Sequence, residues 1–223
     1  MKTNTFIPYA RTGEGLAVYN NDSRFLDVLY SGSLSEGDLD YDSLSMMYKG
    51  MHPEHAEKDL VLVSFGVFDG SIRKEQVLKV ISAAVIYQQK FLSTGDCHKC
   101  RRMTLGDLEK ATDIDISVIS RALDGAVAYT SRGMFTLHNS EASLATPSLF
   151  DEGARKNGRD ISRQEVLFEL NKVIEGEDKT APFTDEKLKE IMVGQGYEVA
   201  RRTVVKYRGL LDCPNSRERR MAA

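Results

Sequence analysis

The chain has 223 residues, of which 41% are hydrophobic and 28% charged, and its formal net charge at pH 7 is −3. This composition is typical of a globular protein with room for one large domain or two to three small ones. The sequence has no apolar run of about 18 residues and no secretory signal after Met1, which predicts a cytoplasmic protein without a membrane span. Its 3 Cys residues, an odd number, offer no disulfide framework.

Charge is distributed unevenly along the chain. Acidic residues gather between Glu36 and Asp42, whereas the segment after Ala200 is basic and has only Asp212 and Glu218 as acidic residues. Its basic residues are Arg201, Arg202, Lys206, Arg208, Arg217, Arg219 and Arg220. A basic end on an acidic body predicts a nucleic-acid-binding module attached to a part with another role.

The first seventy residues are the least informative, and they are left as a separate N-terminal segment. Residues 17–19 and 25–30 are predicted to be short strands around a turn at 20–22. The Ser-, Gly- and Asp-rich residues 31–43 predict an exposed loop. Residues 60–68 form the most apolar run, and their β-branched side chains favour a buried strand.

From Ser71 to Leu92 the spacing of apolar residues predicts a long helix with Ser71 as its N-cap, ending at Thr94-Gly95-Asp96. A pair of short helices follows. Thr104 is predicted to cap the first, which ends near Ala111, and the second runs over residues 115–123 after a turn at 112–114. This arrangement predicts a helix-turn-helix within a region that spans 71–140.

Residues 141–160 are rich in small and polar residues and predict a linker. The last domain, 161–223, is predicted to begin with a helix capped by Ser162, followed by a second helix that starts after Pro182 and Thr184. The sequence therefore predicts a mainly α protein: a helical region with a helix-turn-helix, a linker, and a three-helix C-terminal domain. Its size of about 60 residues is within the range that folds alone.

The third helix of that domain is the most distinctive stretch of the sequence. Apolar residues recur at the spacing of one helical face, and basic residues occupy the rest. The apolar stripe consists of Ala200, Val204, Tyr207 and Leu211. Because Gly196-Tyr197 separates this helix from the preceding one, the pair predicts a DNA-binding helix-turn-helix.

The same stretch reads ARRTVVKYRG from Ala200 to Gly209. It resembles the RpoN box of bacterial sigma-54 factors, ARRTVAKYRE, with Val205 in place of Ala and Gly209 in place of Glu. Upstream, residues 87–96 resemble a Y-Q-x-x-F-x-x-T-G-D string at the end of a family helix that binds core RNA polymerase. Residues 117–121 are similar to the family's STVSR, and Thr130, Gly133, Phe135 and Leu137 are similar to its TPxGxFxL segment.

The resemblance implies that the C-terminal domain binds promoter DNA and reads the GG of the −24 element. Arg201 and Arg202 are the first candidates for base contact, with Thr203, Lys206 and Arg208 holding phosphates or flanking them. The remaining candidates are the Arg residues of a flexible basic tail and one Arg that would lie near the −12 element: Arg217, Arg219, Arg220 and Arg121.

Core RNA polymerase is a second partner that the resemblance implies through residues 71–140. The sequence departs from the family there, with Ala126-Val127 in place of Lys-Tyr and residues 137–141 in place of LKxFF. A stand-alone DNA-binding regulator or competitor that does not bind polymerase is therefore the alternative. Nothing before Ser71 resembles the family's Gln- and Leu-rich region that receives the activator, so we expect no activator-dependent promoter opening by this chain alone.

A third hypothesis is a zinc or redox protein built on Cys97-His98-Lys99-Cys100. Zinc requires four ligands, and the sequence has no second CxxC or HxxxH pair, so an exposed loop is the favoured interpretation. The sequence also lacks a phosphate-binding Gly-rich loop, a nucleophile elbow and a spaced pair of carboxylates. We therefore predict no catalytic residues, no metal and no cofactor.

Overall fold

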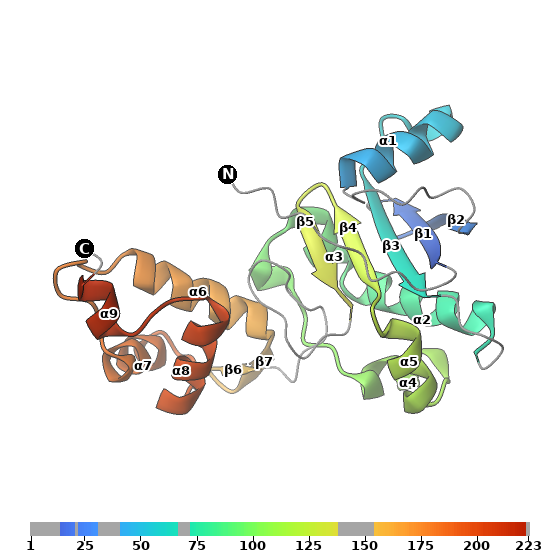
Figure 1. Cartoon of the computed structure of the whole chain (residues 1–223). Helices are drawn as coiled ribbons and strands as arrows, with labels where there is room; N and C mark the ends of the chain where they lie inside the picture. Colours follow the sequence, from blue (N-terminus) through green and yellow to red (C-terminus); the bar gives the residue numbers. More distant parts are fainter. Residues whose placement is uncertain (1–13, 21, 31–40, 67–71, 138–153, 222–223) are drawn as a thin grey trace.

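A computed structural model of the chain describes residues 14–20, 22–30, 41–66, 72–137 and 154–221. These residues form two lobes: an N-terminal lobe in which helices cover a sheet, and a C-terminal lobe that is almost entirely helical (Figure 1). The predicted loop at 31–40, the cap at Ser71 and most of the predicted linker lie outside the described residues.

The N-terminal lobe is organised around a five-stranded antiparallel sheet of order β2-β1-β3-β4-β5. Its strands are β1 Glu14–Asn20, β2 Phe25–Tyr30, β3 Leu60–Gly66, β4 Val127–Thr130 and β5 Gly133–Thr136. The three strands predicted in the first seventy residues are thereby confirmed. Because β3 pairs with β4, the first part of the chain shares one sheet with residues 127–136.

Both faces of this sheet pack against a buried core, which explains why β3 is apolar except at Ser64 and Gly66. Val61, Val63 and Phe65 face one core, and Leu60 and Leu62 face the other, as expected from the alternation of side chains along a strand. The first core is completed by α2 Lys74–Tyr87, α4 Leu105–Thr112 and α5 Ile116–Leu123, and the second by α1 Tyr41–Met51.

Capping and terminating residues fix where most helices of this lobe begin and end. The hydroxyl of Thr104 accepts a hydrogen bond from the amide of Asp107, whose carboxylate accepts one from the Thr104 amide, so the predicted cap of α4 is confirmed. The predicted long helix is divided at Gln88 into α2 and α3 Gln89–Thr94, and Gly95 ends it in the left-handed conformation. Residues 41–43, predicted as loop, instead begin α1.

The C-terminal lobe packs three helices around one apolar core. It contains the helices α6 Arg163–Glu175, α7 Asp185–Gly194, α8 Arg201–Leu210 and α9 Ser216–Met221, and the strands β6 Ala154–Lys156 and β7 Arg159–Ile161. Leu167 of α6, Leu188 of α7 and Val204 of α8 meet in the centre. Ser162 caps α6 and Thr184 caps α7, as the sequence predicted.

The prediction of a mainly α fold is too coarse. Helices account for about half of the described residues, and the N-terminal lobe depends on its sheet. Residues 154–160 lie in the predicted linker, but they form a hairpin with Ile161, and Ala154 and Ile161 contribute to the C-terminal core. No helix in the described parts of the chain is long and apolar enough to span a membrane.

Candidate nucleic-acid interface

The turn between α7 and α8 is fixed by the β6–β7 hairpin. Gly196 has a φ of +91°, and a Cβ there would collide with the side chain of Asn157, so the turn requires glycine. Two backbone hydrogen bonds join the hairpin to this turn: the backbone amide of Asn157 donates to the Gly196 carbonyl (2.9 Å), and the backbone amide of Glu198 donates to the Arg155 carbonyl (2.8 Å). The hairpin therefore sets the position at which α8 begins.

One side of α8 is anchored in the lobe. Val204 and Tyr207 are buried in the C-terminal core. Arg208 is largely buried as well, with its Nε 2.8 Å from Asp185 at the start of α7 and its Nη1 2.6 Å from the carbonyl of Cys213. Arg208, a sequence candidate for DNA contact, thus joins α8 to α7 and to the loop that follows α8.

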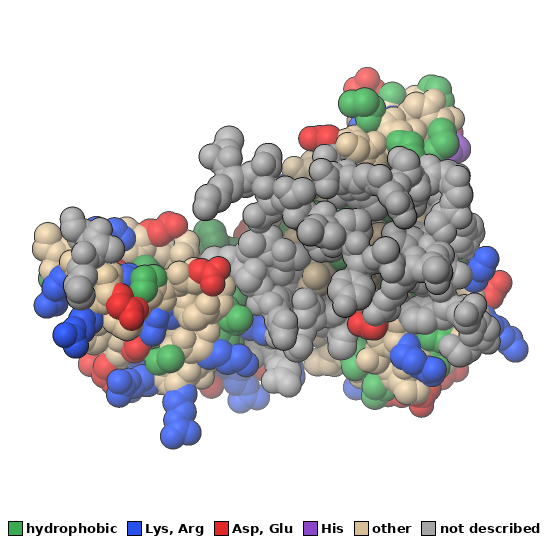
Figure 2. Space-filling view, viewed as in Figure 1, with side chains coloured by type: hydrophobic (Ala, Val, Ile, Leu, Met, Phe, Trp, Pro, Cys, Tyr) green, Lys and Arg blue, Asp and Glu red, His purple; other side chains and the backbone are tan. Residues whose placement is uncertain are grey.

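The opposite side of α8 is exposed and basic. Its exposed residues are Arg201, Arg202, Val205, Lys206 and Gly209, and Thr203 is half-buried. Arg201 lies 4.0 Å from Glu186, a marginal ion pair, and Arg202 and Lys206 have no hydrogen bond or ion pair with any described residue. Figure 2 shows Lys and Arg side chains protruding from the surface of this lobe. We name Arg201, Arg202, Val205, Lys206 and Gly209 the outer face of α8.

The N-terminus of α8 adds to this positive potential. Its N-cap is Ala200, and within the described residues no side-chain hydrogen bond caps this end. Free amide groups and the helix dipole make such an end attractive to anions. Both features act in the same direction as the exposed cations.

The predicted basic tail is ordered as α9, and one of its Arg residues is buried. Arg219 forms a two-pronged ion pair with Glu177 (2.6 and 2.9 Å) and donates to the carbonyls of Pro214 and Phe183. Burial raises the pKa of Glu177, but the hydrogen bonds from Arg219 and from the Phe183 amide outweigh it and bring this pKa below 4.5. Arg219 therefore holds the lobe together, whereas Arg217 and Arg220 are exposed.

The other predicted helix pair, α4–α5, differs from α7–α8 in the charge of its surface. Arg121 is exposed on α5, but its Nε donates to the carbonyl of Ser117 on the same helix (3.1 Å). The Asp115 carboxylate caps α5 by accepting from the Ser117 hydroxyl and from the Ser117 amide, and these two hydrogen bonds, that of the hydroxyl first, lower the pKa of Asp115. Asp113 and Asp124 flank α5, so residues 113–124 combine one cation, Arg121, with three carboxylates.

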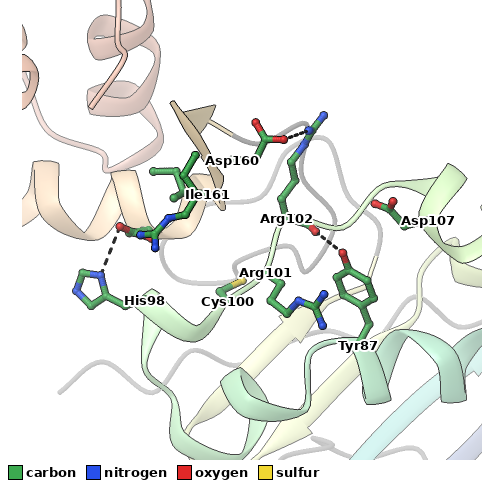
Figure 3. Close-up of a pocket in the computed structure, with 10 residues that line it drawn as sticks. Tyr87, His98, Cys100, Arg101, Arg102, Asp107, Asp160 and Ile161 are labelled. Carbon is green, nitrogen blue, oxygen red and sulfur yellow. Dashed lines mark hydrogen bonds and ion pairs between the residues drawn. The ribbon is translucent and has the colours of Figure 1, made fainter. Parts of the chain in front are cut away.

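A cavity of about 410 Å³ lies between the two lobes (Figure 3). Its lining combines Arg101, Arg102 and Arg159 with Asp107, Asp160 and Glu165, so its charges balance. Arg102 donates to Asp160 across the boundary between the lobes (3.0 Å). The ring of His98 lies 3.6 Å from Glu165 and 3.4 Å from Glu169 on α6. These contacts connect the lobes and leave no excess positive charge for an anion.

The Cys97–Cys100 segment holds a small cluster of potential metal ligands. Burial first, and then the charges of Asp96 and the α6 carboxylates, raise the pKa of Cys97 to about 11, which keeps the thiol protonated at neutral pH. Among the described side chains, the cluster of potential metal ligands is Asp96, Cys97 and His98, three instead of four, and it leaves out Cys100. Cys100 is buried, which differs from the exposed loop predicted from the sequence.

The sequence of the chain matches a known protein family. The profile described as "Sigma-54, DNA binding domain" matches residues 70–221, more than half of the chain. The chain belongs to the sigma-54 DNA-binding domain family. The matched part includes all of α2 to α9 and excludes β1, β2, α1 and β3.

RNA polymerase sigma-54 factors of several bacteria are similar to the chain. The factor of Shewanella violacea is 30% identical over 148 residues and that of Bacillus subtilis is 31% identical over 150. Each match covers 66% of this chain, which spans 28% and 32% of the length of these two relatives. A crystal structure of Aquifex aeolicus sigmaN bound to promoter DNA is 21% identical, with a TM-score of 0.44, and covers 99% of this chain and 62% of that chain.

Sequence reasoning missed the contacts that orient α8. Arg155 and Asn157 lie in the predicted linker, and Glu177 is not among the predicted site residues. The Asn-Gly pair at 157–158 is a hairpin signal that could have indicated the β6–β7 turn. No comparable signal in the sequence pairs Arg219 with Glu177, 42 residues away.

Proposed function

We propose that the chain is a sigma-54-type transcription factor whose α7 and α8 form a helix-turn-helix that binds a −24-type promoter element. The observation that carries this proposal is the outer face of α8, where Arg201, Arg202 and Lys206 project from a helix that has no acidic residue. Its other side is held by the core and by Arg208. A rigid helix with one cationic face suits the major groove of DNA.

The cations have different roles in this proposal. Arg201 and Arg202 read guanine, because the Arg fork matches its O6 and N7, and each such pair contributes about 1–3 kcal/mol of discrimination. Lys206 and the first-turn amides of α8 neutralise phosphates, with Thr203, Arg217 and Arg220 as flanking contacts. Arg208 and Arg219 act indirectly by holding α8 and α9 in place.

We propose core RNA polymerase as the second partner, contacted through the N-terminal lobe. The support is that the family match includes α2 to α5 as well as the C-terminal lobe. Such a protein acts in the bacterial cytoplasm and catalyses no reaction itself.

The alternative is a DNA-binding regulator that does not bind polymerase. The acidic surroundings of Arg121 and the departures at Ala126-Val127 favour it, because they weaken the second DNA contact and the region assigned to polymerase. In either case the DNA contact of α8 is the same. The two proposals differ only in what the N-terminal lobe binds.

Fluorescence anisotropy on short duplexes tests the DNA contact. We expect the full chain to bind a duplex with the −24 GG more tightly than one in which GG is replaced, and Arg202→Ala to reduce this preference by about 1–3 kcal/mol. Lys172→Ala, which removes an exposed cation from α6, is the control and should leave the preference unchanged. Equal affinity of the wild-type chain for both duplexes would refute the proposal.

A gel shift with added core polymerase separates the two partners. A slower complex that contains chain, polymerase and duplex supports the sigma-type function. A shift by the chain alone that polymerase does not change supports the stand-alone regulator.

A further inference from the structure

Five side chains of metal-ligating types meet where the two lobes contact each other. Asp96, Cys97 and His98 lie at the start of a short 3₁₀ helix, and one ligand atom from each lies within 4.8 Å of the other two. Helix α6 of the C-terminal lobe packs against this segment and brings the carboxylates of Glu165 and Glu169 to the His98 ring. We name these five residues the interlobe cluster.

The spacing of His98 and Glu165 fits two ligands of one ion. Nδ1 of His98 lies 3.6 Å from Oε1 of Glu165, which is too long for a good hydrogen bond. Zinc binds N, O and S ligands at about 2.0–2.3 Å, so two ligands of a tetrahedral ion lie about 3.3–3.8 Å apart. Figure 3 shows the ring of His98 turned toward α6. The separation of these two atoms is therefore that of two zinc ligands.

The other ring nitrogen of His98 faces a second carboxylate. Its Nε2 lies 3.4 Å from Oε1 of Glu169, which is four residues after Glu165 and hence on the same face of α6. A metal-ligating His typically donates the N–H of its other ring nitrogen to a carboxylate, which fixes the orientation of the ring. Glu169 occupies the position of that partner and leaves Nδ1 for an ion.

Glu165 is a buried carboxylate with only long contacts to charged groups of the described chain. Its side chain is 7% exposed, and its Oε1 lies 3.6 Å from Nζ of Lys156 and 3.4 Å from the hydroxyl of Tyr197. Glu177, which is also buried in this lobe, has Arg219 at 2.6 and 2.9 Å. A buried charge is costly unless it is closely paired or coordinates a metal. The surroundings of Glu165 therefore suit a bound cation.

Cys97 adds a ligand that distinguishes between metals. After burial, the charges of Asp96 and of the two α6 carboxylates raise the pKa of its thiol, so all three carboxylates lie close enough to act on the sulfur. A thiol binds zinc as the thiolate, and the S–H proton leaves to solvent as the S–Zn bond forms. A set of sulfur, imidazole and carboxylate ligands suits zinc, whereas magnesium and calcium prefer oxygen ligands.

We propose that the interlobe cluster is a structural zinc site that joins the two lobes. Its four ligands are Asp96, Cys97, Nδ1 of His98 and Glu165, and Glu169 accepts the Nε2 proton of the His98 ring. Four protein ligands close the coordination of the ion, as in structural zinc sites. The ion fixes the C-terminal lobe, and with it α8, relative to the N-terminal lobe. This inference does not rest on the proposed function.

Zinc titration of the full chain tests the site. After treatment with a chelator, the wild-type chain should take up one Zn²⁺ per molecule in competition with a chromophoric chelator. Glu169→Gln should weaken the affinity about tenfold to a hundredfold, as for the partner of a metal-ligating His, and Cys97→Ser and Glu165→Gln should weaken it further. Cys100→Ala is the control, because it removes a thiol of the same segment that lies outside the cluster.

Two further measurements report the ligands and the link between the lobes. Co²⁺ in place of zinc should give sulfur-to-cobalt charge-transfer absorption in the wild-type chain and in Cys100→Ala, but not in Cys97→Ser. Zn²⁺ should slow amide hydrogen exchange both at residues 96–99 and in the first turns of α6, and Glu165→Gln should lose this effect. Far-UV circular dichroism of each variant checks that it has folded.

Several results would overturn the proposal. The wild-type chain alone decides it if it takes up no zinc or if its cobalt complex lacks the sulfur band. Loss of zinc in Cys100→Ala as large as in Cys97→Ser would assign the ion to a CxxC pair instead. Wild-type affinity in Glu165→Gln would confine the ion to the N-terminal lobe, and the lobes would not be joined. None of these measurements involves DNA, so their outcome leaves the proposed function untouched.

Discussion

The helix pairs α4–α5 and α7–α8 have the same local design and different surfaces. In each, a Thr hydroxyl caps the first helix by accepting from the third amide, Thr104 in one pair and Thr184 in the other. In each, the turn contains a residue with positive φ, Asp113 or Gly196. The second helix then packs one apolar face into a core and leaves the other face exposed.

The difference lies at the start and on the exposed face of the second helix. α5 begins at Asp115, whose carboxylate accepts from the Ser117 amide, whereas α8 begins at Ala200, which has no side chain that can cap the helix. α8 also carries four basic residues, and α5 carries only Arg121. A helix pair by itself therefore does not indicate DNA binding, and the proposed function assigns the DNA contact to α7–α8 because its second helix presents the cations.

The two pairs are also stabilised differently. α4 and α5 pack against α2 and a sheet, in a core that includes Leu108, Ile119 and Leu123. The C-terminal lobe has a smaller core and adds polar contacts, of which Arg219 with Glu177 and Arg208 with Asp185 are the most buried. We therefore expect substitutions of buried charges to affect α7–α8 more than α4–α5.

The largest expected effect is that of Arg219→Ala. The side chain of Glu177 is 0% exposed, so removal of its partner leaves a buried carboxylate unpaired, which destabilises the C-terminal lobe by about 3–5 kcal/mol. Urea unfolding and amide hydrogen exchange of α7 and α8 would measure it. Arg220→Ala, on the same helix but exposed, is the control. A loss below about 1 kcal/mol for Arg219→Ala would show that the ion pair is not what holds this lobe.

The same ion pair predicts a pH dependence of the C-terminal lobe. The pKa of Glu177 is lowered in the folded state, so its contribution to the free energy of unfolding is fully present above about pH 4.5 and is lost as the pH falls through the lower, folded-state value. Urea unfolding between pH 7 and pH 3 would measure this. Glu177→Gln removes the titrating group and should flatten the acid side of the curve relative to the wild-type chain; identical slopes would contradict the prediction.

A smaller effect is expected at the cap of α4. Thr104→Ala removes the hydroxyl that accepts from the Asp107 amide and should lower the free energy of unfolding of the N-terminal lobe by about 0.5–2 kcal/mol. Thr104→Ser keeps a hydroxyl at the same place and should retain most of the stability. DNA binding by α8 should change in neither variant, and a change would show that the pairs are energetically coupled.

The smallest effect separates phosphate contacts from base contacts. Lys206→Ala should weaken binding to GG and control duplexes alike and reduce the slope of log K against log salt by about 1. Arg121→Ala should leave both the affinity for a −24 duplex and the salt slope unchanged, because Arg121 lies on the other helix pair. Salt titrations of anisotropy would measure both, and a GG-specific loss in Lys206→Ala would instead assign Lys206 to base readout.

Short-range signals allowed much of the fold to be predicted. The caps at Thr104, Ser162 and Thr184 and the left-handed end at Gly95 depend on residues within one turn. The sheet was underestimated because β3 pairs with β4 about sixty residues later, and a single apolar run does not reveal its partner. The hairpin at 154–161 was not predicted, for a related reason. Its polar residues resemble a linker, and its structure depends on contacts with Gly196 and the C-terminal core.

The sequence alone determined the position and outer face of α8, because a helix with apolar residues at regular spacing buries them and exposes the others, Arg201, Arg202 and Lys206 among them. It also determined the family, through the motif from Ala200 to Gly209 and the match over residues 70–221. Only the tertiary structure decided which cations are available. Arg208 and Arg219 resemble the others in the sequence, but Asp185 and Glu177 approach them from distant segments and bury them in ion pairs. Charge can be read along the chain, whereas its pairing depends on how the chain folds.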